Sequence, residues 1–240
     1  MKYPNLEKLV DIIAVLRSEN GCEWDREQTH KSLRPNMLEE AYEAVDAIDE
    51  GDISNLREEL GDVLLQVVLH AQIAKDDGEF DIEDVAKELS DKLIHRHPHV
   101  FGNTEVHSTQ EILDNWDKLK KEEKTYRKSV LDGISKSQSA LMSAQKISKK
   151  VVKVGFEWDC VDSLKNCIQS EYKEFEEAVK SGDKEKMEDE MGDIFFATVN
   201  LARWYKIDAE QALLRANKKF TKRFRKMEEI KTKPFEEYTD

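Results

Sequence analysis

Four acidic residues in the second half of the chain have the spacing of ligands for a divalent cation. Glu171 and Glu174 are three residues apart and share one face of a helix, and Glu190 and Asp193 repeat this spacing on the next helix. A Gly-Asp turn at 182–183 would set the two helices antiparallel, so the carboxylates converge. Their mutual repulsion raises their pKa values unless a cation lies between them. Hard oxygen ligands favour Mg²⁺ or Mn²⁺.

The first half of the chain carries the same set. A shift of 131 positions aligns residues 40–71 with 171–202 without a gap, and ten positions are identical. In a chain with 51 acidic residues, one Glu-x-x-Glu pair is more often a solvated helix face than a ligand pair. Most of the repeated identities are carboxylates and turn residues, which favours the metal site over a solvated face. The matching acids are Glu40, Glu43, Glu59 and Asp62, with Glu39 beside them.

Basic residues on the last helix of each half could bind an anionic substrate. Lys219 and Arg223 are four residues apart, and a shift of 127 matches them to Lys92 and Arg96. A phosphate tail could reach from the metal ion to these cations. Basic residues near the end of a helix also complement its dipole, and this explanation is equally good. Asn217 could contact a sugar or base, although its counterpart in the first half is a serine.

Helical periodicity runs through the whole sequence, and no segment has the alternation of a strand, so an all-α fold is expected. Residues 126–138 lack this periodicity and are the expected linker between an N-terminal module, 1–125, and a C-terminal module, 139–240. The two modules are expected to form helix bundles on dimerisation. The expected helices are 5–18, 36–50, 53–76, 81–97, 108–127, 137–153, 162–180, 184–204 and 208–230.

Composition excludes several other classes of protein. A formal net charge of −13 argues against a nucleic-acid partner, because the phosphate backbone would be repelled. The three cysteines have neither disulfide nor zinc spacing and indicate reduced thiols. The first residues form an amphipathic helix rather than a signal peptide, and no apolar run approaches the roughly 20 residues of a membrane span. A cytoplasmic protein without a membrane partner is expected.

Taken together, the motifs resemble the MazG family. They are Glu-Glu-x-x-Glu at 39–43, Glu-Glu-Leu-Gly-Asp at 58–62, the segment at 91–102 that contains His-Arg-His-Pro-His-Val-Phe-Gly, Glu-Met-Gly-Asp at 190–193 and Asn-Lys-Lys-Phe at 217–220. The similarity covers about residues 5–230. It implies an all-α homodimer that hydrolyses a nucleoside triphosphate, or its deoxy form, to a monophosphate and pyrophosphate with Mg²⁺.

The resemblance also assigns roles to residues. It places the main activity in the C-terminal half, with Glu171, Glu174, Glu190 and Asp193 as metal ligands and catalytic residues. Substrate contacts carry over to the basic and amide side chains Lys219, Arg223, Lys120, Lys186, Asn217 and Lys222. One departure is Ser170, where the first half has Glu39 and the family pattern often has a leading glutamate. Its loss puts water activation or a second metal ion in doubt.

Other interpretations stay open at this point. A specialised dUTP or phosphoribosyl-ATP pyrophosphatase and a non-catalytic nucleotide-binding regulator both fit the motifs. A di-iron oxidase is disfavoured because its Glu-x-x-His pairs are absent. His95, His97 and His99 are expected at a helix end rather than on a metal, because Pro98 interrupts the helix there. Trp24 and Trp158 could stack on a base or anchor a loop.

Overall fold

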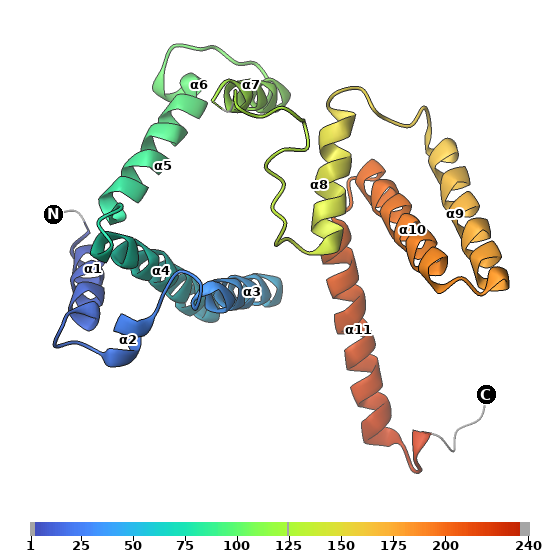
Figure 1. Ribbon diagram of the computed structural model, residues 1–240, viewed down its shortest axis with the longest axis horizontal. Helices are drawn as coiled ribbons and strands as arrows, with labels where there is room; N and C mark the ends of the chain where they lie inside the picture. The colour runs from blue at the N-terminus through green and yellow to red at the C-terminus, as the bar shows by residue number, and fades with distance from the viewer. Residues whose placement is uncertain (1–2, 124, 236–240) are drawn as a thin grey trace. The chain divides into compact units, whose positions relative to one another are not determined.

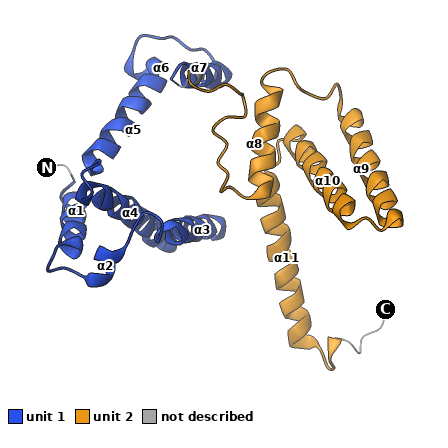
Figure 2. Ribbon diagram, viewed as in Figure 1, with its two compact units in different colours: residues 1–123 blue, residues 124–240 orange. Residues whose placement is uncertain are grey.

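Helices are the regular secondary structure of this chain wherever the structure describes it. The structure is a computed structural model that describes residues 3–123 and 125–235, and these residues form eleven helices and no strand. The predicted all-α class is therefore confirmed. The chain divides into two compact units, residues 1–123 and 124–240 (Figure 2). None of the described helices combines the length and the apolar character that crossing a bilayer would require.

The first unit is built around a helical hairpin (Figure 1). Helices α3 (Arg34–Glu50) and α4 (Ile53–Asp76) pack along each other, and α1 (Pro4–Arg17) packs on α4 and on the short α2 (Glu23–Glu27). Helix α5 (Ile82–Arg96) follows α4 and contacts α6 (Pro98–Phe101) and α7 (Thr109–Glu122). The hairpin carries all the predicted acids of this unit.

The second unit repeats the hairpin with α9 (Val161–Ser181) and α10 (Lys184–Trp204). Helix α8 (Ala140–Val152) packs on α10, as α1 packs on α4 in the first unit. Helix α11 (Ala209–Ile230) contacts α8 and the end of α10, and its later turns extend past α8 within this unit (Figure 1). The duplicated sequence therefore produces a duplicated helical arrangement around the acidic residues.

The same turn chemistry closes both hairpins. Gly51 and Gly182 follow α3 and α9 with φ values of 71° and 73°, a left-handed conformation that costs glycine little. The next residue caps the following helix: Asp52 accepts hydrogen bonds from two backbone N–H groups of α4, and Asp183 accepts one from Lys186 of α10. The repeated Gly-Asp pair thus sets the tight antiparallel turn that the sequence predicts.

Most predicted helices are present within a few residues of their expected bounds, but one was too long. The helix expected over 108–127 ends at Glu122, and residue 124 lies outside the described residues. After Leu119 the segment has only charged and polar residues up to Tyr126, so a longer helix would have no apolar side to bury. Two short helices, α2 and α6, were missed because four or five residues are too few to show periodicity.

The two units fill their cores differently. In the first unit α1 and α4 meet through apolar side chains, including Ile13 and Leu69, which are 3% and 4% exposed. In the second unit buried Ser148 of α8 donates a hydrogen bond to Asn200 of α10 at 2.6 Å. The Ser148 hydroxyl also accepts one from Arg203 Nε at 2.6 Å, and Arg203 pairs with Glu157. Because each of these polar groups has a partner, the buried network is satisfied.

A pair of histidines joins the α2–α3 loop of the first unit to α4. The Nδ1 atoms of His30 and His70 lie 2.7 Å apart, and the rings are stacked with centroids 5.0 Å apart. The contact needs one proton between the two nitrogens, because two protonated rings would have no acceptor and would repel each other. The pKa of His70 is lowered by burial and then by the charge of His30. The repeat places Leu201 at the position that matches His70 in the second unit.

We expect the first unit to lose stability as the solution becomes mildly acidic. The folded-state pKa of His70 lies below its unfolded value, so its stabilising contribution is complete above about pH 6.5 and is lost as pH falls through the folded pKa. Hydrogen exchange read by mass spectrometry should show faster exchange in peptides around residues 28–33 and 66–74 at pH 5.5 than at pH 7.5, after correction for intrinsic rates. In the double variant His30→Leu/His70→Leu this dependence should disappear, and unchanged acid sensitivity there would contradict the assignment.

Candidate metal centres

The hairpin of the second unit brings three predicted ligands together. Glu171 and Glu174 of α9 and Glu190 of α10 each offer a carboxylate oxygen, and these oxygens all lie within 4.8 Å of one another. Glu174 is exposed, whereas the other two are half-buried. Asp193, three residues after Glu190, is exposed and is not one of the three, although it is close enough to affect the pKa of Glu190. The cluster therefore contains three of the four predicted acids, with the fourth beside it.

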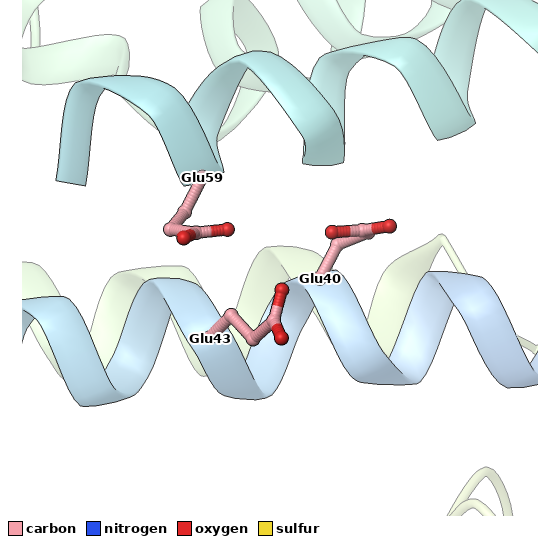
Figure 3. A group of neighbouring side chains, drawn as sticks. All are labelled: Glu40, Glu43 and Glu59. Atoms are coloured by element: carbon pink, nitrogen blue, oxygen red, sulfur yellow. The ribbon is translucent and has the colours of Figure 1, made fainter. Parts of the chain in front are cut away.

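The first unit forms the equivalent cluster. Glu40 and Glu43 extend from α3 toward Glu59 of α4, as Figure 3 shows, and their nearest oxygens lie within the same 4.8 Å. Asp62 lies outside the triad but contributes to the field at Glu40 and Glu59. The two triads occupy corresponding positions of the repeat, so the tertiary structure preserves the acids as a set.

The acids in each cluster repel one another. Partial loss of hydration raises the pKa of Glu59, and the charges of Glu43, Asp62, Glu58 and Glu40 raise it further. The pKa of Glu40 is raised in the same way, by lost hydration and then by Asp62, Glu43 and Glu39. A cation placed among these oxygens would remove the repulsion and restore the ionised forms.

One of the charges that act on the pKa of Glu190 in the second unit is positive. This pKa is raised by partial loss of hydration and by Glu174, Asp193 and Glu171, while Lys186, one turn earlier on α10, opposes the shift. Lys186 was predicted as a substrate contact, and the structure places it beside the carboxylate cluster. A phosphate held at this cluster would therefore have an ammonium group nearby.

Two hydrogen bonds within α9 hold its acidic residues. The sequence singles out one of the donors, Ser170, but not the other, Cys167. The Ser170 hydroxyl donates to Glu174 Oε1 at 3.1 Å, and the Cys167 thiol donates to Glu171 Oε1 at 3.4 Å. Burial, this hydrogen bond and the nearby acids raise the pKa of Cys167, so the thiol stays protonated. Each donor lies four residues before its acceptor, a spacing that could have revealed the contact in the sequence.

The triads have suitable donors for a hard divalent cation. Octahedral Mg²⁺ holds oxygens at about 2.0–2.1 Å, so neighbouring ligands lie roughly 3 Å apart and opposite ones roughly 4 Å apart. The three carboxylate oxygens of each triad lie within 4.8 Å of one another, close to this range. No nitrogen or sulfur ligand belongs to either triad within the described residues, which matches the preference of Mg²⁺ and Mn²⁺ for oxygen.

The predicted substrate cations of α11 lie apart from the acidic triad. Lys219, Lys222 and Arg223 are exposed, as is Asn217, and none of the three basic side chains forms an ion pair with the described part of the chain. Helix α11 contacts α10 only near their connection, where α11 begins. The structure thus leaves these side chains accessible to an anion but does not join them to the triad within the unit.

The matching residues of the first unit have other partners. Arg96 forms a two-point ion pair with Glu123, with Nε 3.0 Å from Oε1 and Nη2 bonded to Oε2. Lys92 is exposed on the same helix, and Lys120 is exposed on α7. Because Arg96 is neutralised by Glu123, the first unit has one less cation to offer a phosphate.

The remaining candidates divide between structural and exposed positions. His97 lies where α5 ends and α6 begins, with its ring edge-on to Trp116 at 4.9 Å between centroids, which is the helix-end position predicted for these histidines. His95 Nε2 lies 3.9 Å from Glu123. Trp24 is 58% exposed and Trp158 is 37% exposed, so neither is a buried anchor.

Fold and site together define a class of helical proteins in which a hairpin holds a Glu-x-x-Glu pair opposite a Glu-x-x-Asp pair. Comparison with known proteins identifies the family within this class. The MazG nucleotide pyrophosphohydrolase domain matches the chain twice, over residues 28–101 and 160–227. The chain belongs to this family, which confirms the resemblance and the tandem duplication found in the sequence.

Two relatives are similar along nearly the whole chain. The nucleoside triphosphate pyrophosphohydrolase/pyrophosphatase MazG of Thermotoga maritima is 47% identical over 225 residues, which cover 93% of this chain and 86% of the relative. The nucleoside triphosphate pyrophosphohydrolase of Escherichia coli K12 is 45% identical over 233 residues, which cover 94% and 88%. The similarity therefore spans both hairpins and the helices that follow them.

Proposed function

We propose that this protein hydrolyses nucleoside triphosphates to monophosphates and pyrophosphate with a divalent cation, Mg²⁺ or Mn²⁺. The observation that carries the proposal is the convergence of the repeated carboxylates on paired helices of a chain that belongs to the MazG nucleotide pyrophosphohydrolase family. Both relatives described above are named as nucleoside triphosphate pyrophosphohydrolases, and their similarity covers the sequence of both clusters.

The side chains of the second unit suit this reaction. Glu171, Glu174 and Glu190, with Asp193 beside them, would hold the cation, which when bound supplies Lewis acidity and orients the triphosphate. The water oxygen forms a new bond to phosphorus while the anhydride between the α- and β-phosphates breaks. A carboxylate that is not fully used for ligation accepts the proton. Lys186 stands next to the cluster and would stabilise the charge that develops on the phosphate oxygens.

We place the main active site in the second unit. Three of its features support this: Lys186 beside the triad, an Arg223 that forms no ion pair with the described residues whereas Arg96 does, and an asparagine at position 217. The first unit offers the same acids, so it supports metal binding without the full set of phosphate contacts. The role of Lys219, Lys222 and Lys120 in substrate binding belongs to the same proposal.

The functional form is proposed to be a homodimer. Large apolar side chains are exposed along the hairpin and α11 of the second unit: Tyr172, Val179, Phe195, Phe196, Leu213, Leu214 and Phe220. A single hairpin with one covering helix leaves this surface in water, and a second copy could bury it. A second copy could also bring α11 cations to a triad that its own α11 does not reach.

Dimerisation predicts a sharp effect of a charge within this surface. Phe220→Glu should shift the protein toward monomer because a carboxylate would be buried without a partner. Multi-angle light scattering across micromolar concentrations measures the mass, and Lys226→Glu on the same helix controls for added negative charge. A wild-type protein that is a stable, active monomer at all concentrations would refute the dimer.

The central test is a substrate panel. Purified protein is incubated with each common ribonucleotide and deoxyribonucleotide triphosphate, with dUTP and with phosphoribosyl-ATP, plus Mg²⁺, and the products are separated by chromatography. Monophosphate and pyrophosphate in equal amounts are expected. Cleavage of dUTP or phosphoribosyl-ATP alone would replace the general activity by a specialised one. Tight nucleotide binding without any product would instead identify a non-catalytic regulator.

A further inference from the structure

The two carboxylate triads have equivalent ligands but different neighbours. Three of the positions that differ between the units concern this inference: Glu39 becomes Ser170, Asn36 becomes Cys167, and Asn55 becomes Lys186. The first change removes a negative charge, and the last adds a positive one. Because the duplication preserves the ligands, each unit serves as an internal reference for the other.

In the first unit the surroundings of the triad are acidic. Glu39 precedes Glu43 by four residues on α3, and its charge acts on the neighbouring Glu40. The charged side chains that raise the pKa of Glu59 are all carboxylates. A divalent cation at this triad would meet negative charge from the ligands and from the residues beside them.

In the second unit Asp193 lies beside the triad as Asp62 does in the first, but three other neighbouring side chains are neutral or basic. Ser170 and Cys167 are uncharged and donate hydrogen bonds to Glu174 and Glu171 at 3.1 Å and 3.4 Å. Each donor uses part of the acceptor capacity of a metal ligand. Lys186 adds a positive charge close enough to affect Glu190. A free cation would therefore be held more weakly here than in the first unit.

We infer that the first unit binds a divalent cation without nucleotide, whereas the second unit takes its cation tightly only as a metal–triphosphate complex. This inference rests on the proposed metal role of both triads. A unit charge about 7 Å from a divalent ion changes its affinity by roughly twofold to sevenfold, depending on ionic strength. Two such changes separate the units, so their affinities for the free ion should differ by about tenfold.

The same differences favour the nucleotide complex in the second unit. The triphosphate brings several negative charges, which are repelled by an additional carboxylate and attracted by an ammonium group. Glu39 would therefore oppose the polyphosphate in the first unit, whereas Lys186 would favour it in the second. The first unit then carries a resident ion, and the second exchanges its ion with each substrate.

Mn²⁺ binding to the full-length protein tests the inference directly. The electron paramagnetic resonance signal of free Mn²⁺ is followed during titration at about 0.15 M salt, without nucleotide. Two classes of site are expected, about tenfold apart. Glu59→Gln should remove the tighter class, and Glu190→Gln should remove the weaker one. Lowering the salt concentration should widen the gap, because exposed charges are then screened less.

Exchanging the neighbours provides the matched controls. Glu39→Ser/Asn55→Lys should weaken the tighter class about tenfold, and Ser170→Glu/Lys186→Asn should strengthen the weaker class by a similar factor. Circular dichroism verifies that the variants remain helical. Equal affinities in the wild type, or swaps that leave both classes unchanged, would overturn the inference even if the protein hydrolyses nucleotides. Two distinct Mn²⁺ classes in a protein that turns over no nucleotide would reject the proposed reaction and support the inference.

Discussion

Glu190→Gln is expected to reduce turnover by roughly a hundredfold or more, the range for removing a group that stabilises charge in a transition state. The substitution keeps the size of the side chain but removes one negative charge from the triad of the second unit. Glu171→Gln and Asp193→Asn should act in the same direction, since each weakens the hold on the cation and the triphosphate. Initial rates of pyrophosphate release at saturating Mg²⁺ measure the effect.

The repeat supplies a matched control for each of these changes. Glu40→Gln, Glu59→Gln and Asp62→Asn remove the same charges from the first unit and should cost much less activity. If the first-unit changes abolish hydrolysis and the second-unit changes do not, the catalytic unit has been assigned wrongly. If each set removes about half of the activity, the two units work independently.

Stability must be measured in parallel, and its expected direction is opposite to that of activity. The raised pKa of Glu190 means that its ionised form is disfavoured in the folded protein. Glutamine cannot ionise, so Glu190→Gln should unfold at the same or a higher temperature than the wild type at neutral pH without metal. A variant that is less active and also partly unfolded would not assign a catalytic role to this residue.

Removal of divalent cations is the second change with a large expected effect. EDTA should abolish hydrolysis, because the acids of each cluster would then repel one another and the triphosphate would lose its partner. Mg²⁺ or Mn²⁺ should restore the activity. Ca²⁺ should restore less, because it takes more ligands at longer and looser distances. The assay follows monophosphate formation before chelation, after dialysis and after each ion is added back.

Full activity in exhaustively metal-stripped protein would reject the metal-dependent mechanism. Na⁺ added at matched ionic strength is the control, because it screens charge without providing a divalent ligand centre. Thermal unfolding with and without Mg²⁺ gives an independent measurement, since an ion that binds only the folded state raises the unfolding temperature.

The sequence determined the parts of this protein that depend on local periodicity. A spacing of three residues on a helix puts two carboxylates on one face, and the Gly-Asp pairs supply a left-handed turn and a helix cap. Both effects act within a few residues. The duplicated hairpins, and the approach of Glu-x-x-Glu acids to an acid of the next helix, could therefore be predicted from the sequence alone.

Contacts between distant segments were decided only by the tertiary structure. No local pattern indicates that His30 meets His70, or that Arg96 is neutralised by Glu123. The sequence placed Asp193 on the same helix face as Glu190. How far each acid lies from the acids of the other helix depends on how the two helices pack, and this packing brings Glu190 into the triad and leaves Asp193 beside it. The same packing leaves the basic side chains of α11 away from the triad of their own unit, because α11 touches α10 only where the two helices join.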